Sequence, residues 1–328
     1  MKTPILLIAF CRIEETKRVF KQIRKAKPEK LYVFNDGPRT EKERINTTEV
    51  RSFITSSIDW ECQVHTLFNE KNMGVGYGPA TAIDWFFRQE EEGIVLEDDC
   101  FASDQFFPFC ETMLERYRND SRVSMIQGFN PFPDYDTDDY YFFSKYNLSW
   151  GWASWRDRWS DFDIKMRDWP EFNSDKNLRS LFNDFLVRAF WRYNFNNRYR
   201  EPDKGWDEQL TYAFMAKRRL ALVPSKCLVL NIGYETHGAT NTRYRIPDHL
   251  RCLKLPDKEF LPRFTDLLAT NSIYDSKVER VHFRINIVFV ARLGLKDFIM
   301  RTKVFSPLYP PLRKIAHFFY RLNYLLSK

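Results

Sequence analysis

The first hundred residues alternate between short apolar runs and segments whose apolar positions recur at helical spacing. The apolar runs predict strands at residues 4–10, 30–35, 63–68 and 94–96. The helical spacing predicts helices at residues 14–25, 41–56 and about 80–91. Strands that alternate with helices indicate a mostly parallel sheet covered by helices. The sequence therefore predicts an α/β, Rossmann-like fold.

The pattern becomes less regular after residue 105. It predicts a helix at 106–117, a strand at 123–127, a helix near 176–193, and a final helix, strand and short strand between 205 and 231, with a turn at Pro224. No repeat or low-complexity linker interrupts this order. We therefore expect one domain over residues 1–250, followed by a helical, basic extension over residues 251–328.

Polar residues follow each of the first four predicted strands: Cys11-Arg12, Asp36-Gly37, residues 69–72, and residues 97–99. The carboxyl ends of parallel strands meet at one edge of a sheet, where ligands bind in such folds. We expect these four groups to lie close together and to form a binding site.

The fourth strand, in the stretch GIVLEDDC, runs into Glu97, Asp98 and Asp99. Adjacent carboxylates repel one another, so a cation is the natural partner. Mg²⁺ and Mn²⁺ prefer oxygen ligands, and one or two aspartates with substrate oxygens suffice to hold them. Asp99 is the strongest candidate metal ligand. An isolated Asp-Asp pair is more often a solvated strand end, but here three neighbouring strand ends also carry polar groups.

Several spaced segments together carry a family resemblance. They are FCR at 10–12, DG at 36–37, residues 70–74, VLEDDCFASDQFFPFCETML, GFNP, SWGWASWRDRW and GWDEQL. The chain resembles the GT-A glycosyltransferases over about residues 3–245. Within them it looks like the branch of the N-acetylglucosaminyltransferase that starts complex N-glycans, and like related bacterial sugar transferases. The resemblance implies inverting transfer from a nucleotide-diphosphate sugar, usually UDP-linked, with Mn²⁺ or Mg²⁺.

The resemblance also implies roles for individual residues. Arg12 would lie against the diphosphate, Asp36 would accept a hydrogen bond from the base, and the turn from Asn72 to Gly74 would pass close to the nucleotide or sugar. Asp98 would hold the ribose or donor sugar, and Asp99 the metal. Phe10 and Glu97 belong to the same donor site, and Asp207 would be the catalytic base. The chain departs from the pattern at Cys100, where an apolar residue is common.

Chemistry independently favours a remote carboxylate such as Asp207. Inverting transfer needs a base that takes the proton of the acceptor hydroxyl, while a metal takes charge from the leaving phosphate. Asp207 begins a predicted helix after Gly205-Trp206. The alternative for a lone aspartate there is an acid that the helix dipole stabilises, and Glu208 is a rival base.

Three other features allow two readings each. The tryptophans of SWGWASWRDRW could bind sugar rings through their flat faces or belong to the core, and Trp152 is the strongest candidate for sugar binding. His237 could touch the diphosphate or the metal, or could simply be solvated. The four aspartates of residues 134–139 are expected to be a solvated loop over the donor, not a second metal site.

Composition and charge bear on location and partners. The chain has 328 residues, 44% of them hydrophobic, which excludes a disordered protein. The N-terminus fits neither a signal peptide nor a membrane span, and six scattered cysteines suit reduced thiols, so we expect a cytoplasmic protein. Residues 280–328 carry a net charge of +9, against +7 for the whole chain. This extension fits an amphipathic surface at the inner face of an anionic membrane, or a helix packed on the domain.

Other function classes fit less well. A nucleic-acid-binding protein is suggested only by the basic tail, because residues 1–279 have a net charge of −2 and contain no nucleic-acid module. A sugar nucleotidyltransferase would want a glycine-rich basic loop after the first strand. A binding module without catalysis is disfavoured by the presence of both Asp99 and Asp207. The sequence thus predicts a glycosyltransferase that acts on a glycan or lipid-linked saccharide in surface polysaccharide synthesis.

Overall fold

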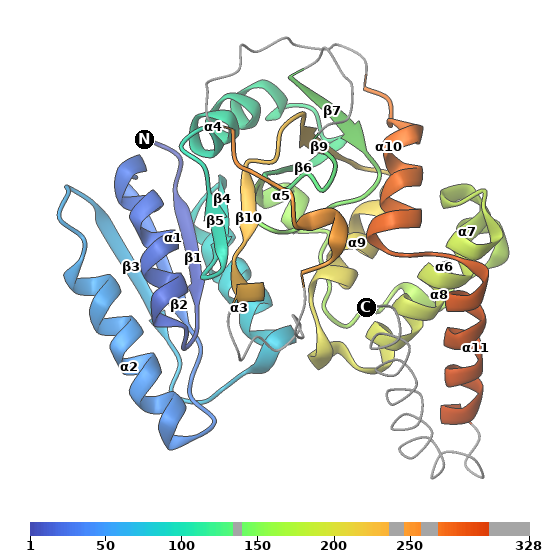
Figure 1. The fold of residues 1–328 in the computed structure, drawn as a ribbon, viewed down its shortest axis with the longest axis horizontal. Helices are drawn as coiled ribbons and strands as arrows, with labels where there is room; N and C mark the ends of the chain where they lie inside the picture. Colours follow the sequence, from blue (N-terminus) through green and yellow to red (C-terminus); the bar gives the residue numbers. More distant parts are fainter. Residues whose placement is uncertain (134–139, 236–245, 257–267, 302–328) are drawn as a thin grey trace.

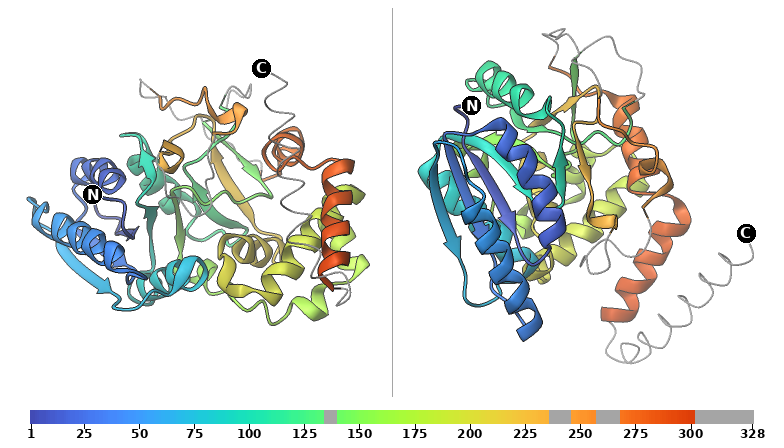
Figure 2. Two further views of the ribbon diagram at one scale, coloured as in Figure 1. Left: turned by 60° about the horizontal axis from the view of Figure 1, so that its bottom comes forward. Right: turned by 60° about the vertical axis from the view of Figure 1, so that its left-hand side comes forward.

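A computed structural model describes residues 1–133, 140–235, 246–256 and 268–301. The predicted loop of aspartates at 134–139, His237 and the end of the tail therefore lie outside the described residues. The described chain folds around one large mixed sheet with helices on both of its faces (Figure 1; Figure 2). This arrangement confirms the predicted α/β, Rossmann-like fold class.

The sheet has eight strands in the order β3-β2-β1-β4-β8-β6-β9-β7. Only β8 and β7 run against the other strands, so the sheet is mostly parallel in direction. A second, two-stranded sheet pairs β5 with β10 in antiparallel fashion. The strands are β1 (Ile5–Ala9), β2 (Lys30–Asn35), β3 (Gln63–Phe68), β4 (Glu92–Glu97), β5 (Cys100–Ala102), β6 (Val123–Gln127), β7 (Tyr141–Ser144), β8 (Trp152–Trp155), β9 (Leu220–Pro224) and β10 (Val229–Asn231).

The helices vary from single turns to four full turns. They are α1 (Ile13–Ala26), α2 (Glu41–Ser56), α3 (Gly74–Gln89), α4 (Phe106–Tyr117), α5 (Arg156–Trp159), α6 (Trp169–Phe172), α7 (Asp175–Leu181), α8 (Phe185–Arg200), α9 (Asp207–Ala216), α10 (Ser272–Lys277) and α11 (Ile287–Arg301). Short 3-10 turns lie at η1 (Pro202–Lys204), η2 (Gly233–Glu235) and η3 (Asp248–Leu250), and a π turn, η4 (Val278–His282), follows α10.

Alternate side chains along the strands enter different cores, as the period of two in a strand requires. In β1, Ile5 and Leu7 pack with α1, α2 and α4 on one face of the sheet. Leu6 and Ile8 pack with α3 and α9 on the other face. Because β1 and β2 are buried on both faces, their sequences read as continuous apolar runs.

Part of the C-terminal extension packs into the same molecule. Tyr274 of α10 and Val278 of η4 are fully buried beside α8 and β7. Asp275 accepts a hydrogen bond from Ser144 Oγ at 2.5 Å, and Glu279 accepts one from Tyr146 Oη at 2.6 Å. The segment through η4 is therefore held against the sheet by buried polar contacts.

Most predicted elements of the first half are confirmed, several with identical bounds, while two predicted helices differ. The helix expected at about 80–91 is α3, which begins earlier, at Gly74. The glycines at 74, 76 and 78 lie within the helix, and the Asp36 carboxylate caps its amino end by accepting a hydrogen bond from the Gly74 N–H. The helix expected near 176–193 is two helices, α7 and α8. Asp184 accepts hydrogen bonds from the Leu186 and Val187 backbone N–H groups and starts α8 afresh.

Candidate active site at the carboxyl edge of the sheet

The centre of the large sheet contains a change in chain direction that creates a binding position. From β1 the chain passes to β2 and β3 on one side, and then crosses over to β4 on the other side of β1. In open α/β sheets, ligands bind beyond the carboxyl ends of the strands at such a switch point. Arg12 follows β1 and Asp98 follows β4, so the sequence places charged groups at this position.

Arg12 joins the first and fourth strand ends through two ion pairs. One guanidinium nitrogen pairs with Asp98, and Nη1 donates to Asp99 Oδ2 at 2.9 Å. Asp98 also accepts the Phe10 backbone N–H at 3.0 Å. Asp98 is 2% exposed and Asp99 7% exposed, so the pairs lie largely away from water. The triple acid at the end of the fourth strand thus has an arginine as its cation in this structure.

The segment after β10 covers this cluster. The Ile232 backbone N–H donates to the Asp99 carbonyl at 2.8 Å, and Gly233 N–H donates to Asn231 Oδ1 at 2.9 Å. A Cβ at Gly233 would lie 2.5 Å from Asp99 Oδ2 and 2.9 Å from Arg12 Nη1. Sequence reasoning missed Asn231 and Gly233, although the Asn-x-Gly spacing directly after a short strand is a signal for a turn that closes on a neighbour.

Asp36, predicted to bind the base, makes its contacts with the start of α3. Its carboxylate accepts the backbone N–H groups of Met73 at 3.0 Å and Gly74 at 3.1 Å, and also Asn69 Nδ2 at 3.2 Å. A carboxylate at the amino end of a helix is stabilised by the unpaired N–H groups there. Asp36 therefore fixes α3 against β2, and its role toward a base remains a prediction.

The predicted turn of residues 72–74 lies against the strand end that carries Asp36. Asn72 Nδ2 donates to the Gly37 carbonyl at 2.8 Å. Gly74 has φ +80°, in the left-handed region that favours glycine. The contact with Gly37 holds the turn at the carboxyl end of β2, on the same edge of the sheet as Arg12.

The amino end of α3 also positions Asp207. A Cβ at Gly76 would lie 2.6 Å from the Pro202 carbonyl oxygen and 2.8 Å from the Asp203 carbonyl carbon, so the backbone of η1 passes directly over this glycine. Only two residues separate η1 from Asp207, the first residue of α9. The contact therefore links the α3 turn, and through Asp36 the end of β2, to the candidate base.

This contact predicts a defined cost for Gly76→Ala. Overpacking against backbone costs about 1–3 kcal/mol, and the higher helix propensity of alanine offsets at most about 1 kcal/mol. We expect a lower free energy of unfolding in a urea titration. The matched control is Gly294→Ala in α11, where a Cβ would meet nothing within 4 Å. Equal stability of the two variants would contradict the close contact.

Asp207 lies within electrostatic range of the triple acid. Burial raises the pKa of Glu97 to about 8, and the negative charges of Asp99, Asp98 and Asp207 add to that rise, while Arg12 opposes it. Desolvation by the surrounding protein also raises the pKa of Asp207, although water reaches its side chain. A carboxylate that is accessible but poorly solvated is a better proton acceptor than one in free water.

Glu208, the rival base, has a partner of its own. Its Oε2 lies 2.6 Å from Arg198 Nε, an ion pair with the last turn of α8. Burial and the neighbouring charge of Asp207 raise the pKa of Glu208 to about 7, against the effect of Arg198. The ion pair turns Glu208 toward α8, whereas Asp207 has no ion pair in the part of the chain that the structure describes. Asp207 is therefore the better candidate for the base.

The sugar-binding role expected for Trp152 is corrected by the structure. Trp152 is 1% exposed and lies in the middle of the sheet, in β8. Its ring stacks with Trp159 and Trp206 at centroid distances of 6.3 and 6.2 Å, so no face is open to a sugar. Trp150, by contrast, is partly exposed, and its ring contacts Tyr234 of η2 at 5.9 Å, next to the segment that covers Asp99.

The donor atoms at this site fit a divalent ion that arrives with a ligand. Among the described residues, no group of three His, Cys, Asp or Glu side chains is placed to hold a metal by itself. Asp99 pairs with Arg12 through one oxygen, and among the described residues the other oxygen has only the Cys100 thiol at 3.7 Å. Mg²⁺ keeps several waters and is bound in proteins by one or two carboxylates and substrate phosphates. Asp99 would supply such a carboxylate.

Comparisons with known proteins do not assign the chain to a family. No family model and no curated protein matches the chain. Among solved structures, it is similar to a mannosyltransferase of Pyrobaculum calidifontis in complex with GDP-Man and Mn²⁺, with 9% identity and a TM-score of 0.36 over 66% of this chain and 70% of that chain. It is also similar to the glycosyltransferase GlyE of Streptococcus pneumoniae TIGR4, with 10% identity and a TM-score of 0.31 over 67% of this chain and 45% of that one.

A third solved structure is HddC from Yersinia pseudotuberculosis, with 10% identity and a TM-score of 0.26 over 38% of this chain and 56% of that chain. The chain thus spans only about half the length of HddC and of GlyE. Likenesses with TM-scores this low do not show a shared function, and the residues of this chain are the better guide to it.

Proposed function

We propose that the protein is a glycosyltransferase that takes a sugar from a nucleotide-diphosphate donor and transfers it, with inversion, to a hydroxyl of a glycan or lipid-linked saccharide. The observation that carries the proposal is the pair of oppositely charged groups at the switch point of the sheet. A guanidinium such as that of Arg12 suits the binding of a phosphate, and the carboxylate of Asp99 beside it suits a divalent ion. A nucleotide diphosphate with its metal requires both kinds of group in one place.

The chain's own residues supply the remaining steps of the reaction. Arg12 would exchange its carboxylate partners for the diphosphate, and Asp99 would hold Mn²⁺ or Mg²⁺, which would stabilise the leaving phosphate. Asp207 accepts the proton of the acceptor hydroxyl as that oxygen attacks the anomeric carbon from the opposite side. The raised pKa of Asp207 suits this role, since it keeps the carboxylate basic. The UDP preference and a role in surface polysaccharide synthesis are parts of the same proposal.

Thermal unfolding with a panel of nucleotides tests the proposal. A ligand that binds only the native state stabilises it by about 2.7 kcal/mol at a hundred times its Kd. We expect a nucleoside diphosphate or its sugar to raise the unfolding temperature when Mn²⁺ is present, and UDP compounds to do so most. A panel of UDP, GDP and their sugars that leaves the unfolding temperature unchanged, with and without Mn²⁺, would overturn the proposal.

A further inference from the structure

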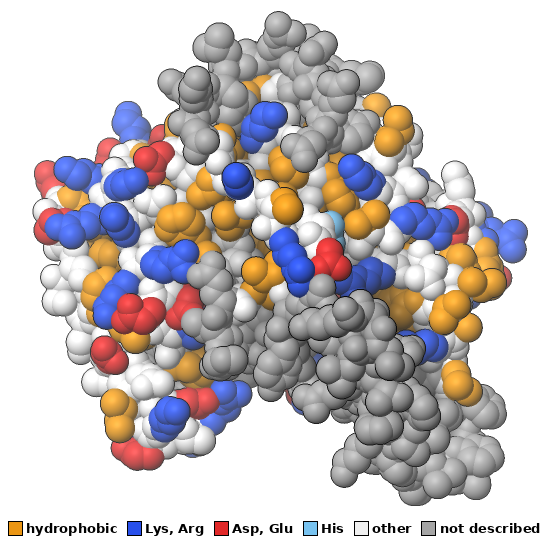
Figure 3. Space-filling view, viewed as in Figure 1, with side chains coloured by type: hydrophobic (Ala, Val, Ile, Leu, Met, Phe, Trp, Pro, Cys, Tyr) orange, Lys and Arg blue, Asp and Glu red, His pale blue; other side chains and the backbone are white. Residues whose placement is uncertain are grey.

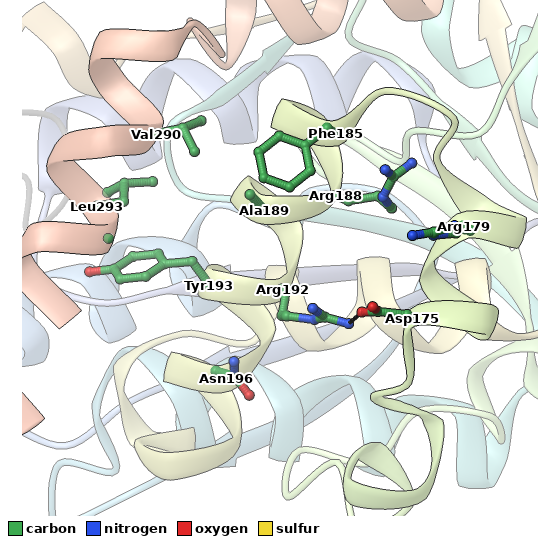
Figure 4. A pocket seen from close by; sticks show the side chains of 11 residues that line it. Asp175, Arg179, Phe185, Arg188, Ala189, Arg192, Tyr193, Asn196, Val290 and Leu293 are labelled. Carbon is green, nitrogen blue, oxygen red and sulfur yellow. Dashed lines mark hydrogen bonds and ion pairs between the residues drawn. The ribbon is translucent and has the colours of Figure 1, made fainter. Parts of the chain in front are cut away.

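A groove whose lining residues are separate from the candidate active site lies between α7, α8 and α11 (Figure 4). Its volume is about 390 Å³. One wall is cationic and is formed by Arg179 of α7 and by Arg188 and Arg192 of α8. The other wall is apolar and includes Val290 and Leu293 of α11. A groove with two such walls fits a ligand that has an anionic group attached to an apolar chain.

The cationic wall has unused capacity to bind an anion. Arg192 forms an ion pair with Asp175, and its buried Nε has no hydrogen-bond partner among the residues that the structure describes. Arg188 donates to the carbonyl oxygens of Phe182 and Asn183, which neutralises none of its charge. Arg179 has no hydrogen bond or ion pair within the part of the chain that the structure describes. Three arginines therefore face one acid.

The arginines of the cationic wall lower the pKa of Asp175, the acid that lines the groove. The hydrogen bond and charge of Arg192, and then the charges of Arg179 and Arg188, lower the pKa of Asp175. All three arginines therefore lie within electrostatic range of Asp175 and act on the same region. An anion there is attracted by the same charges.

The apolar wall continues onto an exposed apolar surface. Phe185, at the rim of the groove, is 69% exposed, and on α11 Ile287 is 70%, Val288 65% and Leu295 60% exposed. Hydrophobic side chains gather over α11 on the face shown in Figure 3. No helix in the described part of the chain has the length and apolar character needed to cross a membrane. A surface of this kind fits contact with a bilayer at its headgroup level.

The charge of the groove decides between its possible occupants. Residues 302–328 of this chain contain five Lys and Arg and no Asp or Glu, so their charge does not complement a cationic wall. A second copy would bring the same arginines against one another. We propose that the groove between α7, α8 and α11 binds the phosphate of an anionic membrane lipid, with the lipid chain along Phe185 and α11.

The groove is connected to the candidate active site by α8. This helix runs from the groove to Arg198, which pairs with Glu208 next to Asp207. Six residues separate Arg192 from Arg198, which corresponds to about 9 Å along a helix. Helix α8 thus connects the groove to the neighbourhood of the candidate base. That the bound lipid carries the acceptor rests on the proposed function, whereas binding of the lipid does not.

Vesicle binding in the absence of nucleotide tests the inference separately from transfer. The full chain is sedimented with phosphatidylcholine vesicles that contain or lack phosphatidic acid. We expect binding only with phosphatidic acid. Arg179→Glu should weaken this binding at least about fivefold, the effect of one basic residue near an anionic surface. Arg88→Glu on α3, whose side chain is 79% exposed, is the matched control and should bind like the unmodified protein.

Two further variants keep the result decisive. Phe185→Ser should also weaken vesicle binding, because it removes apolar contact without changing charge. Inorganic phosphate should compete poorly, since it lacks the lipid chain. The inference is overturned if Arg179→Glu and Arg88→Glu bind equally, or if Arg313→Gln with Lys314→Gln in the tail abolishes binding that Arg179→Glu leaves intact. It is equally overturned if inorganic phosphate displaces the vesicles fully while Phe185→Ser binds normally, which would define a phosphate site without a lipid.

Discussion

Asp207→Asn should lower kcat by about 10²–10⁴ while the affinity for the nucleotide-sugar donor stays unchanged. The expected loss is the contribution of a positioned general base, which the amide cannot provide. The donor affinity should persist because the donor contacts expected at Arg12 and Asp99 are left in place. Single-turnover transfer to an acceptor and calorimetric titration of the donor measure the two quantities separately.

Glu208→Gln is the matched control for this experiment. Glu208 follows Asp207 in the first turn of α9, and its ion pair with Arg198 turns it away from the candidate base position. We expect it to retain most transfer activity. A larger loss in Glu208→Gln than in Asp207→Asn would instead assign the base to Glu208.

The pH dependence of transfer provides a second measurement on Asp207. The base acts only when ionised, so kcat falls as the pH falls through its pKa. Because the surrounding protein raises the pKa of Asp207, this acid limb should lie above the ordinary range of an aspartate. An acid limb in the ordinary range of a solvated aspartate would contradict the assignment.

Asp99→Ala should remove the dependence of donor binding on Mn²⁺. In the proposed site Asp99 is the protein carboxylate that the metal shares with the diphosphate, and a lost metal ligand leaves only the contact with Arg12. We expect the affinity for a nucleoside diphosphate in the presence of Mn²⁺ to fall at least about tenfold, since one charge-assisted contact contributes about 1.5–3 kcal/mol. Calorimetric titration with and without Mn²⁺ measures the change.

Asp104→Ala is the control for Asp99→Ala. Asp104 lies five residues further along the chain and pairs with Lys25 on the surface, with a side chain that is 65% exposed. It should bind nucleotide and Mn²⁺ like the unmodified protein. Equal Mn²⁺ effects in the unmodified protein and in Asp99→Ala would remove the metal from the proposal, although Arg12 could still bind the diphosphate.

The parts of the fold that local sequence determines were predictable. Strands β1 to β4 alternate with well-patterned helices, and the ends of β1 and β4 meet where Arg12 and Asp98 pair. The strands of the second half depend on distant partners. Strand β8 lies between β4 and β6, and its side chains read as a tryptophan cluster and not as an alternating strand. Tertiary pairing, which no local pattern contains, decided its structure.

In the candidate site, too, the sequence predicts some features, while others depend on tertiary packing. The identity of Asp99 and Asp207 as acids at element ends could be read from the sequence. Their partners could not be read, because they depend on packing between distant segments. The cover of Asp99 by Gly233, the closure of η1 on Gly76 and the use of Asp36 as a helix cap each join segments more than thirty residues apart. The sugar-binding prediction for Trp152 was wrong for the same reason, since the sequence alone does not distinguish a buried tryptophan from one that binds a sugar ring.

The ion pairs of Arg12 bear on the order in which ligands enter the proposed site. Without substrate, Arg12 already offsets part of the charge of Asp98 and Asp99, so a free divalent ion gains little by displacing it. A diphosphate with its metal offers Arg12 a new anion and Asp99 a new cation in one event. We therefore expect the metal to enter together with the nucleotide sugar, so that the protein without its donor holds no resident ion and becomes competent for the proposed transfer only when the donor is bound.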